Sequence, residues 1–321
     1  MFKTAKTLCC ATLVALVTVG SFAGTLYRTY EWDFQGSTWT WRLSIPYKAY
    51  QFFNDLPRTD DYSIYVTNPY DDQYLASLVD VLEEAAREAG YDEWETINFV
   101  VSFVQSLPYT SDRVTTGYDE YPRYPIETLV DRGGDCEDTS ILTAALLYQM
   151  GYDVILLAFS NHVAVGIWCD YIPGGYYTVD GRDYYYLETT GRGWEIGEIP
   201  EERQGETASI IELIPKPLLQ FSWKSDSVWW DRSSVIYEIQ VTVTNYGSTA
   251  SWATLCYVAL ESRPGYVWDQ AESDPLTIQP FGRGIYTFSL KCPRGERTKL
   301  LVKVWSDNHP IITVQSDWFR P

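Results

Sequence analysis

The spacing of apolar residues predicts two amphipathic helices in the first third of the chain. Between 71 and 89, apolar side chains recur three and four positions apart, and Gly90 supplies a helix end. The same spacing continues over 94–106, where Leu107-Pro108 ends the pattern. Each helix is therefore expected to bury one face.

A third helix is predicted after the turn Gly133-Gly134. Asp135 is a good N-cap residue, and Asp138 stands three positions on, where its carboxylate can reach back to the cap. The run from Ile141 to Leu147 is apolar nearly all round. This helix is expected to be buried on every side.

Alternating and β-branched stretches predict strands on both sides of these helices. The segments 30–34 and 39–43 flank a turn at 35–38 and form a predicted hairpin. After the third helix, strands are predicted over 154–159, 161–168 and 183–190. An α+β domain follows from this order of elements.

The pattern changes beyond Pro215 and Pro217, which mark a domain boundary because prolines so close resist both helix and central strand. Further strands are predicted at 235–244, 253–260, 284–290, 300–305 and 311–314. Their spacing is typical of a β-sandwich, and 242–247 is similar to a strand-turn signature of immunoglobulin-like modules. Cys256 and Cys292 both fall here, where a disulfide would be permitted in an exported chain.

The first 24 residues read as an export signal. Lys3 and Lys6 precede an apolar run from Leu8 to Val19, and Ser21-Phe22-Ala23 offers a cleavage site. The segment is either removed or stays as a membrane anchor. We therefore expect four parts: 1–24, a hairpin and connection over 25–70, a domain over 71–214, and a sandwich over 218–321. The mature protein is expected to be extracellular or on the cell surface.

The net charge of the chain limits the classes of partner that we expect. The chain carries a formal net charge of −19 over 321 residues, which disfavours nucleic acid and anionic membrane surfaces. No cysteine or histidine cluster has zinc-ligand spacing, so we expect neither a metal site from those ligands nor a cofactor. The acidic pairs Asp60-Asp61 and Asp71-Asp72 are expected to be solvated loop charge rather than calcium ligands.

Cys136 is the candidate nucleophile because it opens the buried helix. Unpaired backbone N–H groups and the helix dipole favour a thiolate there. A thiolate is disfavoured by the nearby negative charges of Asp135, Glu137 and Asp138, so a cationic partner is needed. The chain has two histidines, and His162 stands at the mouth of a predicted strand that can face the helix.

A carboxylate on the next strand could orient the imidazole. Glu188 lies among aromatic and β-branched residues, and Asp180 and Asp183 are alternatives on the same hairpin. The chain order Cys136, His162, Glu188 follows the triad logic of papain-like enzymes.

Three ordered blocks, GGDCEDTSILTAALLYQMGYDV, NHVAVGIW and YYYLETTGRGWEIGEIP, resemble the transglutaminase-like superfamily, in particular its archaeal exported members. The resemblance covers about 71–200. It implies a papain-like α+β core with Cys136 as nucleophile, His162 as base and Glu188 in the third position. That position is usually aspartate, so glutamate departs from the family pattern.

The tyrosine-rich stretch 109–124 is predicted to be a loop that walls a substrate groove, with Tyr109, Tyr121 and Tyr124 as contacts for an extended peptide. The alternative is that these rings pack the loop. The backbone N–H of Cys136 is the first candidate oxyanion donor, and Gln105 or Tyr109 could supply a second.

Together these features predict a cysteine enzyme that transfers or hydrolyses acyl groups on protein or peptide amides. Whether an amine or water resolves the thioester is left open. The alternative is a surface-binding module that retains the fold with its thiol idle.

Overall fold

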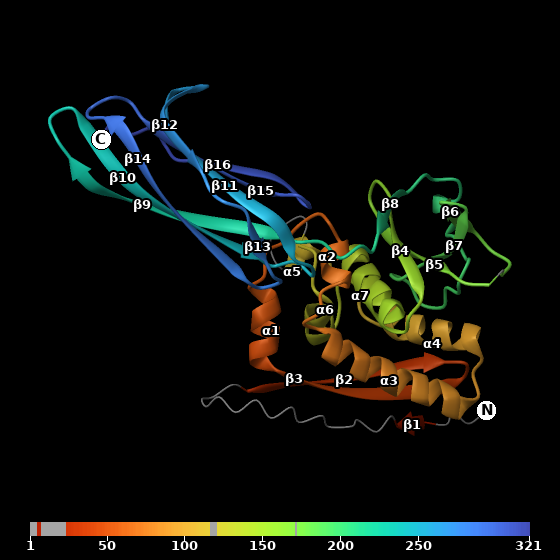
Figure 1. Ribbon diagram of the computed structural model, residues 1–321. Coiled ribbons are helices and arrows are strands. Elements are labelled where there is room, and N and C mark those ends of the chain that lie inside the picture. The colour runs from red at the N-terminus through yellow and green to blue at the C-terminus, as the bar shows by residue number, and fades with distance from the viewer. Residues whose placement is uncertain (1–4, 8–23, 116–120, 171) are drawn as a thin grey trace. The chain divides into compact units, whose positions relative to one another are not determined.

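The computed structural model describes residues 5–7, 24–115, 121–170 and 172–321, and the chain divides into two compact units, 1–214 and 215–321 (Figure 1). The helices of the first unit are α1 Tyr47–Asn54, α2 Ser63–Val66, α3 Asp72–Ala89, α4 Glu93–Gln105, α5 Asp112–Thr115, α6 Pro125–Asp131, α7 Cys136–Gln149 and a 3-10 turn Glu201–Arg203. Its strands are β1 Ala5–Thr7, β2 Thr25–Phe34, β3 Ser37–Pro46, β4 Asp153–Ala158, β5 Val163–Trp168, β6 Tyr176–Val179, β7 Arg182–Leu187 and β8 Ser209–Glu212. The α+β class is confirmed.

Helix α7 lies at the centre of the first unit. Helices α2, α3, α4 and α6 and strands β4 and β5 all contact it, and Figure 1 shows it between the helices and the sheet. Every residue from Glu137 to Leu147 is buried. The prediction of a helix buried all round is confirmed, because an apolar surface on every side can only be satisfied by neighbours on every side.

The sheet that faces α7 has the order β6-β7-β5-β4-β8, and all its neighbours are antiparallel. Val165 of β5 pairs with Leu187 of β7. Because the strands run in opposite directions, the start of β5 lies beside the end of β7. His162, just before β5, and Glu188, just after β7, are therefore brought together by register alone.

The predicted N-terminal hairpin is confirmed and extends further than its alternating core. Strands β2 and β3 pair from end to end around the two-residue turn Gln35-Gly36, where both residues have positive φ, 47° and 75°. Strand β1 pairs in parallel with β3. The buried face stacks on α4, with Trp32 and Trp39 against Phe99.

The helices α3 and α4 agree with prediction, but the connection 47–69 and the loop 109–124 contain helices that the pattern did not indicate. Helices α1 and α2 lie in the connection, α5 lies in the loop, and α6 begins directly after the loop at Pro125. Part of the loop, 116–120, is outside the described residues. Short helices carry too few turns to show a periodic signal.

The second unit is all-β. Its strands are β9 Leu219–Trp230, β10 Ser234–Asn245, β11 Ser251–Arg263, β12 Tyr266–Glu272, β13 Leu276–Ile278, β14 Arg283–Pro293, β15 Lys299–Ser306 and β16 His309–Gln315. One sheet has the order β14-β10-β9, and the other has β12-β11-β15-β16 with β13 beside β11. Residues of both sheets share one core, which confirms a β-rich C-terminal part.

Cys256 and Cys292 are buried in that shared core, and both are free thiols. The disulfide that the sequence permitted is therefore absent from the described structure. The second histidine, His309, lies in this unit, where its Nε2 accepts a hydrogen bond from the Leu219 N–H at 3.3 Å.

Across the residues that the structure describes, no helix combines the length and apolar character needed to cross a bilayer. The predicted export signal or anchor at 1–24 lies almost entirely outside these residues.

Candidate active site

The chain enters α7 through two glycines that approach their neighbours too closely for a side chain. A Cβ atom on Gly133 would lie 2.5 Å from the Pro108 carbonyl oxygen, and one on Gly134 would lie 2.4 Å from Asp138 Cβ. Asp138 Oδ2 accepts a hydrogen bond from the Asp135 N–H at 3.3 Å, as predicted for the cap. This turn fixes the residue that follows it, Cys136, in the first turn of the helix.

The thiol of Cys136 is hydrogen-bonded to the next residue in the chain. Its Sγ donates a hydrogen bond to Glu137 Oε2 at 3.2 Å. Burial and the negative charge of Glu137 raise the thiol pKa to about 12, although the backbone N–H of Val163 acts in the opposite direction. None of the hydrogen bonds among the described residues joins Sγ to His162. The thiol nevertheless lies beside the residue that follows His162 in the chain.

His162 and Glu188 form a buried pair. His162 Nε2 lies 3.0 Å from Glu188 Oε2, which also accepts from the Tyr186 hydroxyl at 2.7 Å. Glu188 Oε1 accepts from the backbone N–H groups of Thr189 and Thr190, both at 3.0 Å, and from Thr190 Oγ1 at 2.6 Å. Burial alone would raise the pKa of Glu188, but the hydrogen bond and charge of His162 outweigh it and lower the pKa to about 2. Glu188 is therefore an ionised acceptor.

The two alternative carboxylates are placed elsewhere. Asp180 is exposed at the turn between β6 and β7 with a positive φ of 49°. Asp183 accepts a hydrogen bond from Thr178 Oγ1 at 2.7 Å on the same hairpin. Of the three, Glu188 is the one in contact with His162.

Hydroxyl groups tie the start of α7 to the strand ends that carry His162 and Glu188. Ser140 Oγ donates to the Val163 carbonyl at 2.8 Å and lies 3.0 Å from Thr189 Oγ1. Thr139 Oγ1 lies 2.9 Å from the same Thr189 oxygen. The first turns of α7 are thus joined to the residues that directly follow His162 and Glu188. Sequence analysis did not identify these three residues, since single hydroxyls on a buried helix give no distinctive pattern.

Gln105 does not offer a free donor to an oxyanion. Its Nε2 donates to the carbonyl oxygens of Glu188 at 2.8 Å and Trp194 at 2.9 Å, and its Oε1 accepts from the Gly193 N–H at 3.1 Å. Both amide hydrogens are therefore used. Gln105 instead holds the segment that follows Glu188 in place.

The three predicted substrate tyrosines are in different environments. Tyr109 is 59% exposed, and its backbone forms an isolated bridge with Gly134 next to the start of α7. The Tyr121 hydroxyl accepts a hydrogen bond from Arg58 Nη2 at 2.6 Å. Tyr124 is 0% exposed and packs against Tyr65, with ring centroids 4.6 Å apart. A fully buried ring cannot wall an open groove, so the structure corrects the expectation for Tyr124.

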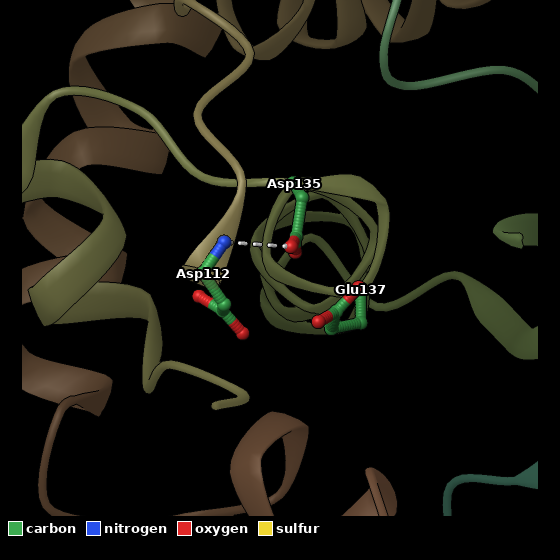
Figure 2. Close-up of side chains that lie close together, drawn as sticks. All are labelled: Asp112, Asp135 and Glu137. Atoms are coloured by element: carbon green, nitrogen blue, oxygen red, sulfur yellow. Dashed lines mark hydrogen bonds between the residues drawn. The ribbon is translucent and has the colours of Figure 1, made fainter. Parts of the chain in front are cut away.

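Buried acidic groups surround Cys136. Carboxylate oxygens of Asp112, Asp135 and Glu137 lie within 4.8 Å of one another (Figure 2), and burial raises the pKa of Glu137. Asp138 faces Arg123, whose Nη1 contacts it, yet burial raises the pKa of Asp138 to about 7. Asp112 was missed because it lies 23 positions before Asp135, in a stretch predicted as loop.

Asp71 also departs from expectation. The sequence indicated solvated loop charge, but the side chain is fully buried at the start of α3 and neither carboxylate oxygen has a hydrogen-bond partner. Burial and the charge of Asp72 raise the pKa of Asp71 well above its ordinary value.

Comparison with known proteins gives one informative result. Residues 79–198 match the family described as transglutaminase-like domain. None of the curated proteins matches the chain. The matched segment contains Cys136, His162 and Glu188.

Solved structures share only weak likeness. The CARDB domain of a Pyrococcus furiosus protein, in complex with di-metal ions, is 17% identical, with 32% of this chain and 88% of that chain covered and a TM-score of 0.23. A protein from Archaeoglobus fulgidus is 17% identical over 32% of this chain and 98% of its own, with a TM-score of 0.22. Likenesses at these scores have no bearing on function. The family match concerns one segment: residues 79–198 are similar to the transglutaminase-like domain family.

Proposed function

We propose that the domain over 71–214 has a papain-like core and catalyses thiol-dependent acyl transfer or hydrolysis on protein or peptide amides. The observation that carries this proposal is the buried His162–Glu188 pair at 3.0 Å, beside the helix end that holds Cys136. The family match over all three residues supports it. In this proposal Cys136 is the nucleophile, His162 the base and Glu188 the group that orients the imidazole.

The chemistry would proceed in two stages. His162 Nε2 is engaged by Glu188, so the other ring nitrogen, Nδ1, takes the proton from Sγ as sulfur attacks the amide carbon. The C–N bond then breaks, and His162 returns the proton to the leaving amine, which leaves a thioester on Cys136. Attack by an amine or by water on the thioester carbon releases the sulfur. The backbone N–H of Cys136 would stabilise the oxyanion at both stages.

The resting contact of the thiol must change before this reaction. Sγ is hydrogen-bonded to Glu137. Because the pKa of the Cys136 thiol is raised to about 12, the thiol is almost fully protonated at neutral pH. Catalysis therefore requires that Sγ leave Glu137 and form a thiolate–imidazolium pair with His162.

We place substrate against Tyr109 and Tyr121. Tyr109 is exposed next to the helix start, and Tyr121 is held by Arg58 on the stretch that precedes α6. A flat aromatic surface beside the thiol suits an extended peptide backbone or a glutamine side chain. Tyr124, being buried, supports the fold rather than the substrate.

A peptide library analysed by mass spectrometry, with and without a primary amine, tests the activity. Amine incorporation identifies a transferase, and cleavage or deamidation identifies a hydrolase. Products should disappear in Cys136→Ala and in His162→Ala but persist in Cys169→Ala, which removes a thiol outside the proposed site. Equal product formation by all four proteins would disprove the proposal.

A second candidate function is a non-catalytic surface-binding module. The state of the Cys136 thiol favours this function, because the thiol is hydrogen-bonded to Glu137 and its pKa is raised to about 12. In this case the second unit would be an immunoglobulin-like sandwich that binds a protein or glycan, and Cys136→Ala would retain full binding.

Both functions are proposed to operate outside the cytoplasm. The basis is the N-terminal pattern of Lys3, Lys6 and an apolar run, which would act as a signal or as a membrane anchor. The partner is expected to be a protein or peptide rather than nucleic acid, because the chain carries a formal charge of −19.

A further inference from the structure

A cavity of about 360 Å³ lies in the second unit between edge strands of its two sheets. Trp268 and Asp269, which line it, belong to β12, while Lys291 and Cys292 belong to β14 of the other sheet. The two strands are in contact, and Figure 1 shows them close together. The Lys291 N–H donates to Asp269 Oδ2 at 2.9 Å and joins the sheets at this point. The volume lies at the lower end of the range of about 300–1,000 Å³ that is usual for small-ligand sites.

An irregularity of β12 brings Trp268 to this cavity. Asp269 pairs with Leu260 and Val267 pairs with Glu261, so Trp268 is an extra residue without a partner on β11. Such bulges change the direction of a side chain and often lie next to binding sites. Trp268 is 39% exposed. The bulge thus keeps a large aromatic ring both at the cavity and in contact with solvent.

The turn between β9 and β10 adds hydroxyl groups to the lining. Ser233 and Ser234 both line the cavity, and their backbone N–H groups each donate to Asp231 Oδ1 at 2.7 Å. Their hydroxyls donate to the same oxygen at 2.9 and 3.3 Å. A hydroxyl that donates one hydrogen bond still has lone pairs that can accept others. The turn is therefore fixed, with its acceptors in place before a ligand binds.

The charges of the lining balance each other. Among the described residues that line the cavity, the charged ones are Asp269 and Lys291, one of each sign. Asp269 Oδ1 accepts from the Gln270 N–H at 2.9 Å, and each oxygen of this carboxylate can accept a further hydrogen bond. Lys291 is exposed, and its ammonium group can donate. The cavity thus offers an aromatic ring, acceptors and a donor without excess charge.

We propose that this cavity binds a pyranose ring of a neutral glycan. The C–H groups on one face of a pyranose pack well on the electron-rich face of an indole ring, here that of Trp268. The sugar hydroxyls both donate and accept, so they match the serine, carboxylate and ammonium groups of the lining. An acidic sugar would bring a negative charge that the lining does not offset. An extended peptide would need a longer groove than this compact cavity.

A second exposed ring favours a chain of sugars over a single one. Trp230 of β9 pairs with Val235, and Val235 pairs with Cys292 of the cavity lining. Directly paired residues share one face of a sheet, and strands lie about 4.8 Å apart, so the backbones of Trp230 and Cys292 are about 10 Å apart. Trp230 is 59% exposed. A neighbouring sugar of the same chain would be within reach of this ring.

This inference rests on the second candidate function only in treating the second unit as a binding module, and it names the class of ligand. It does not depend on the chemistry of Cys136. A catalytic first unit would carry the same glycan site on the second unit.

Affinity electrophoresis of the full chain tests the site, in gels that contain hydroxyethyl cellulose, galactomannan or soluble starch. We expect retardation in at least one of these neutral polysaccharides and none in polygalacturonate, whose sugars are acidic. Trp268→Ala should raise the apparent dissociation constant about tenfold or more, because it removes the stacking surface. Trp268→Phe retains an aromatic face and should bind more tightly than Trp268→Ala.

Trp252→Ala is the matched control. Trp252 is 51% exposed on β11. It lies eight residues before Leu260, the partner of Asp269, which places it about 26 Å along the strand from the cavity. This variant should be retarded as much as the unmodified protein.

Four results would overturn the site. They are no retardation in any neutral polysaccharide, retardation in polygalacturonate alone, binding of a poly-L-proline peptide without binding of a neutral polysaccharide, and equal retardation of Trp268→Ala and Trp252→Ala. Cys136→Ala should be retarded like the unmodified protein although it forms no products with peptides. Failure of the glycan site and failure of the proposed acyl transfer can therefore be told apart.

Discussion

Ser140 Oγ donates a hydrogen bond to the carbonyl oxygen of Val163 at 2.8 Å, which joins the first turns of α7 to the start of β5. Ser140 lies one helical turn after Cys136, and Val163 follows His162. Replacing Ser140 with alanine leaves a buried carbonyl without this donor and should cost about 1–3 kcal/mol of unfolding free energy. It should also slow any reaction that needs Cys136 and His162 together.

Denaturant unfolding and the rate of product formation measure the two effects of Ser140→Ala. Ser102→Ala is a suitable control, because Ser102 Oγ donates to the Phe99 carbonyl at 2.7 Å within α4, where only local structure depends on it. If both variants have a lower free energy of unfolding but neither forms product more slowly, the hydrogen bond between Ser140 and Val163 has no role in positioning the site.

The close approach of Gly134 to Asp138 gives a second prediction. A Cβ atom at 134 would lie 2.4 Å from Asp138 Cβ, so Gly134→Ala must move Asp138 away from Arg123 or shift the helix start. We expect a loss of about 1–3 kcal/mol, as for other overpacked positions. Gly24→Ala, where nothing lies within 4 Å, should change the unfolding free energy by less than about 0.5 kcal/mol. Equal effects at the two positions would contradict the packing described here.

The Glu188 carboxylate should make stability depend on pH in the acidic range. Its folded-state pKa is lowered from 4.5 to about 2, so its contribution is complete above pH 4.5 and is lost as the pH falls through 2. The shift corresponds to about 3 kcal/mol. We expect unfolding free energy to rise more steeply between pH 2 and 5 in the unmodified protein than in Glu188→Gln, by up to that amount. If the unfolding free energy depends on pH in the same way in both proteins, the Glu188 carboxylate does not have the lowered pKa described here.

Cys136 should react slowly with iodoacetamide at pH 8. A thiol whose pKa is about 12 instead of 9 has on the order of a thousandfold less thiolate at that pH. Glu137→Gln removes the adjacent charge and should speed alkylation of the Cys136 peptide about tenfold or more. Glu83→Gln, on the exposed surface of α3, should leave the rate unchanged. Fast alkylation of the unmodified protein under these conditions would contradict the neutral-thiol state.

Much of the fold could be predicted because its signals are local. Helix α3 shows a regular apolar spacing with Gly90 at its end, and α7 is apolar all round, as its central position requires. Strand β9 shows no such signal, since most of its residues beyond Phe221 are exposed. The short helices α1, α2 and α6 owe their form to packing rather than periodicity.

The residues of the candidate site also differ in how far the sequence could predict them. Cys136, His162 and Glu188 could be named from local pattern and family resemblance, and the register of β5 with β7 explains why two of them meet. Asp112 and Thr189 could not, because their roles arise from contacts between segments distant in sequence. Tyr124 was misjudged because sequence does not distinguish an aromatic side chain that packs a core from one that lines a groove.

The most direct test of the account is the reaction of the purified full chain with a glutamine-containing peptide library and a primary amine, followed by mass spectrometry. The account predicts modified or cleaved peptides with the unmodified protein, and none with Cys136→Ala or His162→Ala. Products that form equally well in all three, or in none of them, would contradict it.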